Sequence, residues 1–304
     1  MSLLEEAGAR TRRPVDVVNW TAEEGARFAP AMLASGAVAG VHDTEFVYSR
    51  RDAAGLTFGA ELERIGYRGG REHRPQQIHA SLEVHIEQGT VLEDSGDAVG
   101  IVEGIAPVRW HQVTVTGRGE HAGGPGLRHR QDAAVAAARM IAKARDLALA
   151  ADDFKATVGI ITAQPGSTNV VPHTVRFSLD VRAATDEGLD EAVRLVADGF
   201  AGIAAEEGVE VAVEETWRLP PTEFDPGLRN LIQATAARLK HRSRRLLGGI
   251  GHDSMYLARV TRAAMIFTPP SVACPTASKK TPPVDLRAPL RWLRLPLRGE
   301  PADG

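Results

Sequence analysis

The segment from residue 82 to residue 89 combines an imidazole with carboxylates at the spacing of a strand. Its sequence is Leu-Glu-Val-His-Ile-Glu-Gln-Gly. Because successive strand side chains point to opposite faces, Glu83, His85 and Glu87 are expected to share one face. Such a face could supply ligands or move protons. The alternative is the solvated face of an edge strand, since a histidine on a strand needs no ligand role.

Two adjacent acids, Glu23 and Glu24, follow the apolar segment 15–20, which predicts a buried strand. In α/β sheets the functional loops lie at the carboxyl ends of strands. One carboxylate could bind a metal ion while its neighbour accepts a proton from a metal-bound water. The alternative is an acidic helix N-terminus, which the helix dipole favours.

A third candidate is His121, within the glycine-dense segment Gly-Arg-Gly-Glu-His-Ala-Gly-Gly at 117–124. Glycines allow the backbone to approach a ligand closely, and loops between a strand and a helix often carry function. The alternative is an ordinary surface histidine.

The composition is that of a globular protein with small-molecule chemistry. The 304 residues carry 36 basic and 39 acidic side chains, for a formal net charge of -3. This balance offers no field to recruit nucleic acid or an anionic membrane, and no apolar run approaches a membrane span. The single cysteine, Cys274, excludes an intrachain disulfide and a cysteine-rich metal site, so we expect a cytoplasmic protein.

Between residues 111 and 217 the elements predict the order β-α-β-β-α-β, which is the split unit of a ferredoxin-like sandwich. The expected strands are 111–116, 157–162, 175–181 and 209–213, and the expected helices are 131–149 and 185–205. We therefore expect an α/β fold in which residues 109–217 form an inserted α+β domain. Residues 1–108 and 218–304 would form the flanking α/β domain, with a helix at 226–240 and a strand at 263–267.

Several of these segments resemble the hydantoinase/carbamoylase family of dinuclear-metal amidohydrolases. The segment 82–89 matches the family's Leu-Glu-x-His-Ile-Glu-Gln-Gly signature, and 23–28 resembles its Glu-Glu-Gly-x-Arg-Phe segment. Residues 117–132 resemble its His-Ala-Gly...Arg-x-Asp-Ala segment, 169–182 its Asn-x-Ile-Pro...Asp-x-Arg segment, and 251–253 its Gly-His-Asp segment. The resemblance covers residues 1–272 in family order.

The resemblance implies a metallo-aminopeptidase-like catalytic domain and a role for each matching residue. Glu24 and His85 would be ligands of two divalent ions, which could be Zn, Mn, Co or Ni. Glu23 would be the general base and His121 the group that stabilises the oxyanion. Arg182 would clamp the substrate carboxylate with two parallel hydrogen bonds, although a strand-end salt bridge is the alternative. The remaining substrate contacts would come from Gln88, Asn169, Gly251 and His252.

The chain also departs from the family pattern. A His-x-Asp segment and a metal-bridging Asp are expected upstream of the Glu-Glu pair, and residues 1–22 contain neither. A Gly-x-Ser-His segment is expected after Met265-Ile266-Phe267, but Val272-Ala273-Cys274-Pro275 follows. The codons for 273–278 can be read in a shifted frame as Leu-Ser-His-Arg-Glu. We therefore expect a chain truncated at its N-terminus, altered at its C-terminus and weakly active or inactive.

One more departure concerns the His121 loop. Gly124-Pro125-Gly126-Leu127 stands where the family has Thr-Pro-Met.

Several functional alternatives stay open. The substrate could be a carbamoyl amino acid, ureidopropionate or allantoate. The resemblance implies a homodimer formed through the inserted domain. A non-catalytic dimerising remnant, a small carboxylate binder, and an aminoacylase or peptidase of the same superfamily are the alternatives.

Overall fold

The structure is a computed structural model that describes residues 6, 8, 10–70 and 77–270. Two compact units divide the chain, one formed by Met1–Ile105 with Glu223–Gly304 and the other by Ala106–Thr222. We call them the outer unit and the inserted unit and describe each by itself.

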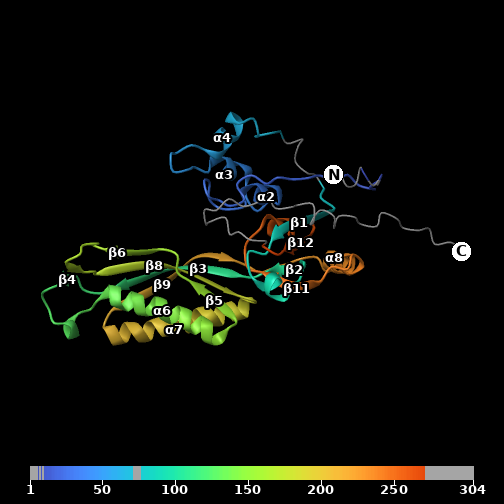
Figure 1. Cartoon of the computed structure of the whole chain (residues 1–304). Helices are drawn as coiled ribbons and strands as arrows, with labels where there is room; N and C mark the ends of the chain where they lie inside the picture. The colour runs from blue at the N-terminus through green and yellow to red at the C-terminus, as the bar shows by residue number, and fades with distance from the viewer. Residues whose placement is uncertain (1–5, 7, 9, 71–76, 271–304) are drawn as a thin grey trace. The chain divides into compact units, whose positions relative to one another are not determined.

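The inserted unit contains a five-stranded antiparallel sheet with two long helices on one face (Figure 1). Its elements are β3 (Val108–Thr116), α6 (Ala133–Ala151), β5 (Phe154–Thr157), β6 (Ile161–Gln164), β8 (Thr174–Ala183), α7 (Asp186–Glu207) and β9 (Glu210–Leu219). The sheet order is β5-β8-β3-β9, with β6 also paired to β8. The mixed α/β fold class with a ferredoxin-like unit is confirmed.

Local signals account for the helices of the inserted unit. Asp132 caps α6 by accepting from the backbone of Ala134, and Thr185 caps α7 by accepting from Gly188. Phe177 of β8 and Phe200 of α7 are fully buried, with ring centroids 5.9 Å apart. The helices therefore cover the face of β8 that carries its odd-numbered residues.

The strand predicted at 157–162 is instead two short strands, β5 and β6. Both pair with β8, but the hydroxyl of Ser178 accepts hydrogen bonds from the backbone N–H groups of Gly159 and Ile160, at 3.2 and 3.0 Å. The Ser178 side chain thus satisfies two N–H groups between β5 and β6, while the backbone N–H of Ser178 donates to the carbonyl of Ile160 at 3.0 Å.

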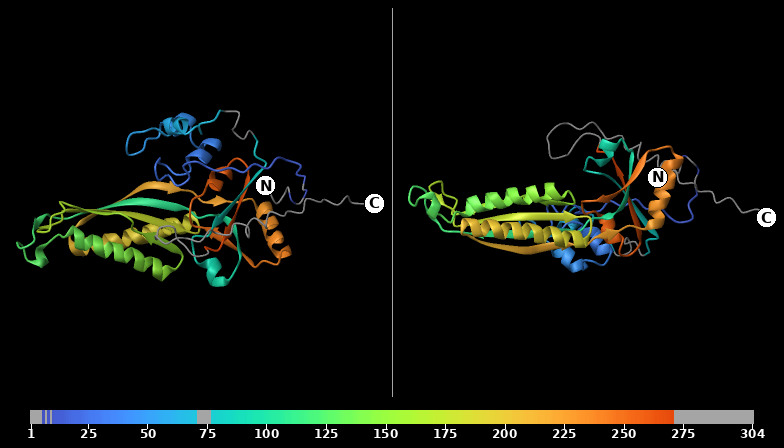
Figure 2. Two further views of the ribbon diagram at one scale, coloured as in Figure 1. Left: turned by 45° about the horizontal axis from the view of Figure 1, so that its top comes forward. Right: turned by 90° about the horizontal axis from the view of Figure 1, so that it is seen from below.

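The outer unit contains a mixed sheet and several short helices, seen from two further directions in Figure 2. Its strands are β1 (Ala80–Ile86), β2 (Val99–Ile105), β10 (Thr222–Glu223), β11 (Ser243–Gly248) and β12 (Arg262–Thr268). Its helices are α2 (Leu33–Val38), α3 (Thr44–Ser49), α4 (Phe58–Arg64), α5 (Val91–Ser95), α8 (Pro226–Arg238) and α9 (Asp253–Leu257). β1 runs parallel to β12, so the strand that carries Glu83 and His85 lies beside the strand that carries Met265-Ile266-Phe267. None of the helices described is long and apolar enough to cross a membrane.

The prediction of a buried strand at 15–20 is wrong. None of the described strands pairs with this segment, and the side chain of Val17 is 80% exposed. A strand needs a neighbour to satisfy its backbone groups, so an apolar β-branched run alone does not form one. Residues 271–304, on which the expectation of an altered C-terminus rests, lie outside the described residues.

Candidate active site

The polar face of β1 packs against the start of α9. The carboxylate of Glu83 accepts two hydrogen bonds from Ser254, from its backbone N–H at 3.1 Å and its hydroxyl at 2.7 Å. The opposite face is the more exposed one, since Leu82 and Val84 are each 42% exposed. The alternative of a solvated polar face is therefore not supported for Glu83 and His85.

Two histidine rings lie next to each other beside Glu83. The ring centroids of His85 and His252 are 4.5 Å apart. The Nδ1 atom of His85 lies 2.8 Å from the carbonyl oxygen of Ile86, which fixes the ring and leaves Nε2 as the atom able to bind a ligand. His252 is 2% exposed and neither of its ring nitrogens has a hydrogen-bond partner.

Burial and the nearby His85 lower the pKa of His252 to about 4. The Nδ1 atom of His252 is 3.7 Å from a Glu83 oxygen, but a ring with this pKa is neutral near pH 7. We therefore treat the contact as a dipolar one and not as an ion pair.

Glu23, next to Glu24 in the sequence, lies within electrostatic range of Glu83 and His85. Burial, followed by the charges of Asp253, Glu24 and Glu83, raises the pKa of Glu23 to about 7, although His85 acts in the opposite direction. Burial also raises the pKa of Asp253 to about 6, although its hydrogen bond from Ser35 lowers it. A carboxyl group with a pKa near 7 suits a general base at neutral pH.

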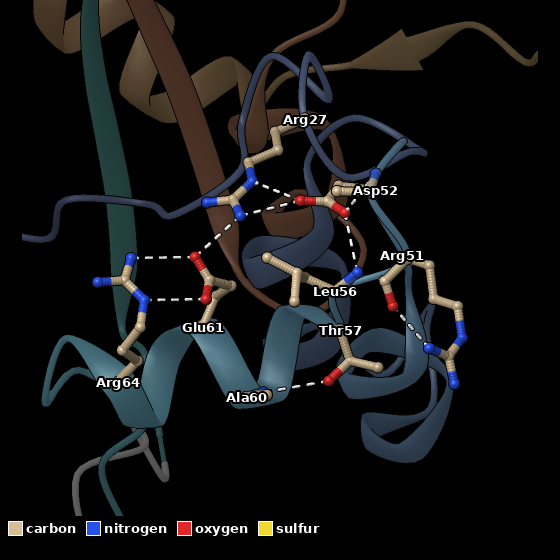
Figure 3. A network of polar contacts seen from close by, with 10 residues as sticks. Arg27, Arg51, Asp52, Leu56, Thr57, Ala60, Glu61 and Arg64 are labelled. Carbon is tan, nitrogen blue, oxygen red and sulfur yellow. Dashed lines mark hydrogen bonds and ion pairs between the residues drawn. The ribbon is translucent and has the colours of Figure 1, made fainter.

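The loop that carries Glu23 and Glu24 is held by the residues that follow them. Gly25 has φ +67°, and a Cβ there would lie 2.7 Å from the backbone nitrogen of Ala31. The guanidinium of Arg27 bridges Asp52 and Glu61, and Arg64 holds Glu61 from the other side (Figure 3). The loop and the segment Phe58–Ile65 line an open pocket of about 490 Å³.

Glu87, near the end of the 82–89 segment, does not share the strand face that the alternation predicts for it. β1 ends at Ile86, and Glu87 caps α5 by accepting from the backbone N–H groups of Val91 and Leu92, at 3.0 and 2.8 Å. Alternation stops where the strand stops, so Glu87 does not join Glu83 and His85. Gln88 follows with φ +54°, a left-handed conformation that is uncommon for a residue with a side chain.

The inserted unit brings together two other candidates, His121 and Asn169. β4 (Glu120–His121) pairs antiparallel with β7 (Val170–Val171), with His121 opposite Val170. The backbone N–H of Ala122 donates to the carbonyl of Asn169 at 2.8 Å. Two loops almost fifty residues apart in sequence are thereby held side by side.

Arg182 forms an ion pair on its own strand. Asp180 accepts from Nε of Arg182 at 2.8 Å and from Nη2 at 2.6 Å, and this carboxylate raises the pKa of Arg182. The strand-end salt bridge considered from the sequence is thus present. It occupies the edge of the guanidinium formed by Nε and Nη2.

The residues of the outer unit match metal chemistry only in part. Carboxylate and imidazole are suitable donors for Zn, Mn, Co or Ni, and the free Nε2 of His85 fits such a role. However, no three His, Cys, Asp or Glu side chains are grouped so as to hold a metal ion in the part of the chain that the structure describes. These residues alone do not fit a dinuclear site.

Known proteins are similar to this chain in sequence and in fold. The family model described as Peptidase family M20/M25/M40 matches residues 1–291. An N-carbamoyl-L-amino-acid amidohydrolase of Rhizobium meliloti is 37% identical over 267 residues, which are 88% of this chain and 64% of that protein. An allantoate amidohydrolase of Bacillus subtilis is 30% identical, covering 88% of this chain and 65% of that protein. A hydantoinase/carbamoylase family amidase of Burkholderia ambifaria has a TM-score of 0.83 at 39% identity, covering 90% of this chain and 68% of that one.

The fold and the motifs thus define an M20-type protein, and the chain belongs to Peptidase family M20/M25/M40. Its resemblance to the hydantoinase/carbamoylase amidases is confirmed. The chain spans about two thirds of the length of the curated relatives that it matches, from 64% to 65%.

Sequence reasoning missed the partners that orient the candidate residues. Ser254, Ser35 and Asp180 were not singled out, although Asp180 stands in the Asp-x-Arg segment and Ser254 directly follows Gly-His-Asp. Their position beside a matched motif was the available signal. Their partners are distant in sequence for Ser254 and Ser35, which no local pattern reveals.

Proposed function

We propose that this chain belongs to an amidohydrolase that cleaves the ureido C–N bond of an N-carbamoyl-L-amino acid or an allantoate-type acid. The observation that carries the proposal is Glu23, a carboxyl with a pKa of about 7 beside Glu24, Glu83 and His85. The names of the relatives supply the substrate class. The acid and imidazole groups of the outer unit would form the catalytic part.

Each candidate residue would act on a particular part of the substrate or on the attacking water. Glu23 would accept a proton from the attacking water and pass it to the leaving nitrogen. His121 would donate to the developing oxyanion, and Asn169 and Gln88 would bind the ureido group. Arg182 would bind the substrate carboxylate, with Gly251 and His252 lining the site. Divalent ions held in part by Glu24 and His85 would supply Lewis acidity when bound.

We further propose that the chain as given binds metal weakly and hydrolyses slowly, because the described donors form no group of three. The test is metal content after loading with Mn²⁺ or Zn²⁺ and gel filtration, together with ammonia release from N-carbamoyl-L-amino acids. We expect fewer than two ions per chain and slow turnover that Glu23→Gln abolishes. The exposed Glu45→Gln is the matched control and should turn over at the unchanged rate. Two ions per chain with fast turnover would contradict the claim of weak binding, and turnover that survives Glu23→Gln would contradict the role of Glu23.

The second candidate function is a carboxylate binder without catalysis. It is favoured by the inserted unit, which holds His121, Asn169 and Arg182 and has its own buried core. Binding of an N-carbamoyl amino acid with no ammonia release under any metal loading would support it over hydrolysis.

The homodimer is a proposal as well. β6 pairs with β8, its four side chains are exposed, and Ile161 is 58% exposed. An exposed strand of this kind can pair with a second copy. Sedimentation of the full chain should show a dimer that Ile161→Lys weakens, and a monomer at all concentrations would contradict the proposed dimer.

We also propose the cytoplasm as the location, because the chain has a single cysteine.

A further inference from the structure

One pocket of the outer unit is lined both by the candidate general base and by apolar side chains. Its volume is about 490 Å³, within the roughly 300 to 1,000 Å³ typical of small-molecule sites. The segment 20–28, with Glu23 and Glu24, forms one part of the lining, and the segment 58–65, which is α4 with its C-cap residue, forms the other. A ligand that fills this pocket would therefore contact a carboxyl group and an apolar wall together.

The apolar wall of the pocket comes from one side of α4. Phe58, Leu62 and Ile65 are four and three positions apart, so they follow one another along one face of the helix. Phe58 and Leu62 are buried, and Phe28 packs on Phe58 with the ring centroids 5.2 Å apart. Ile65, in contrast, is 50% exposed. The apolar stripe thus starts in the core and ends in a side chain that a ligand can reach.

The charged side chains beside this apolar wall are paired with one another. The guanidinium of Arg27 contacts Asp52 and Glu61 at 2.9 and 2.8 Å. Arg64 donates to both carboxylate oxygens of Glu61, at 2.9 and 3.0 Å (Figure 3). Two positive charges are thereby balanced by two negative ones, so this wall offers a charged ligand group little net attraction.

Such a wall distinguishes between the substrates that the proposed function leaves open. Allantoate carries a second ureido group at the carbon atom where an N-carbamoyl amino acid carries its side chain. Ureidopropionate carries no side chain at all. An apolar group gains free energy against an apolar wall, whereas a ureido group loses free energy there unless it finds hydrogen-bond partners. The lining therefore favours an apolar side chain over a second ureido group.

We infer that this pocket holds the side chain of the substrate, and that the substrate is an N-carbamoyl-L-amino acid with a large apolar side chain. The inference rests on the proposed function, in which Glu23 acts on the water that attacks the ureido group. Trp20 and Ile65 line the pocket from its two segments and would contact the substrate side chain. Ile65 is the specificity-determining residue, because it is the accessible end of the apolar stripe.

The test compares the dissociation constants of N-carbamoyl-L-leucine, N-carbamoylglycine and allantoate. Isothermal titration of the full chain, as purified and again with Mn²⁺, gives the three constants without requiring turnover. The leucine derivative should bind at least about tenfold more tightly than the glycine derivative, as expected for added carbon atoms in an apolar pocket. Allantoate should bind no more tightly than the glycine derivative. The heat-capacity change should be most negative for the leucine derivative, because burial of apolar surface produces that signature.

Two variants locate the discrimination in this pocket. Ile65→Ser should weaken binding of the leucine derivative by about fivefold, as expected for the loss of apolar contact area. Binding of the glycine derivative should change less than twofold. Because a general loss of structure would weaken both, the difference between them reports on the pocket. Val260→Ser is the matched control: Val260 is 54% exposed on the turn after α9, outside the pocket lining, and its replacement should leave all three constants unchanged.

The outcomes separate this inference from the proposed function. If the leucine and glycine derivatives bind equally, or if allantoate binds most tightly, the pocket does not hold an apolar side chain while hydrolysis of ureido acids stands. If the leucine derivative is preferred but Ile65→Ser leaves the preference unchanged, the side chain binds elsewhere and the inference is wrong. If the wild-type chain binds none of the three ligands with or without Mn²⁺, the proposed function fails and the inference fails with it.

Discussion

Glu83 on β1 and Ser254 on α9 are joined by two hydrogen bonds across 171 positions of sequence. The contact fixes the first turn of α9 to the strand that carries His85. It therefore ties the Gly-His-Asp segment to the His-Ile-Glu-Gln-Gly segment and offers the first prediction.

Replacing Ser254 by Ala should destabilise the chain by about 1 to 2 kcal/mol, because it leaves a charged acceptor with one donor fewer. The measurement is urea unfolding at neutral pH. Ser49→Ala on the exposed side of α3 is the control, with an expected change of less than about 0.5 kcal/mol. Equal losses in the two variants would show that the contact adds no stability.

Replacing Gly25 by Ala should cost more than the same change at Gly40. Both residues have positive φ, +67° and +71°, so both variants lose about 1 to 2 kcal/mol from the backbone conformation. Only at Gly25 would the new Cβ meet backbone, 2.7 Å from the nitrogen of Ala31. The difference between the two variants in thermal unfolding isolates this crowding, and it should be absent if the loop can shift freely.

His252 should make the fold sensitive to acid. Its folded pKa of about 4 lies below the value for an unfolded histidine, so the unfolded chain binds a proton first as the pH falls. The contribution of the neutral ring is complete above about pH 6.5 and is lost progressively toward pH 4. From pH 7 to pH 5, wild type should lose on the order of 1 to 2 kcal/mol more than His252→Gln. Parallel losses would mean that the ring titrates normally.

The contribution of Glu23 to stability should depend on pH in the opposite direction to that of His252. Its folded pKa of about 7 is above the ordinary value, so the folded chain binds the proton more tightly and stability is lost as the pH rises from about 4.5 to 7. In the metal-free protein, Glu23→Gln should therefore have a higher melting temperature than wild type at pH 8 and a similar one at pH 4.5. Glu45→Gln, an exposed acid on α3, should show no such change. A Glu23→Gln variant with no gain at pH 8 would contradict the raised pKa.

The local sequence pattern was sufficient to predict most helices and strands of the inserted unit. Alternation predicted β8, and helical composition and periodicity predicted α6 and α7 to within a few residues. These signals are local because a helix satisfies its own backbone within four residues and a buried strand repeats every two. The segment 15–20 shows the limit of this reasoning, since its apolar pattern is that of a strand but pairing depends on a distant neighbour.

The sequence by itself determined the family, because motifs of matching residue types and spacing stand in order along the chain. It also placed His85 and Glu83 on one face of a strand. Only the tertiary structure decided what each group touches. Glu87 turned to cap α5, Ser254 reached Glu83, and Trp110 reached Asp180, since these contacts join residues whose approach depends on packing and not on local period. The raised pKa of Glu23 has the same origin, because burial and neighbouring charges arise only when distant segments meet.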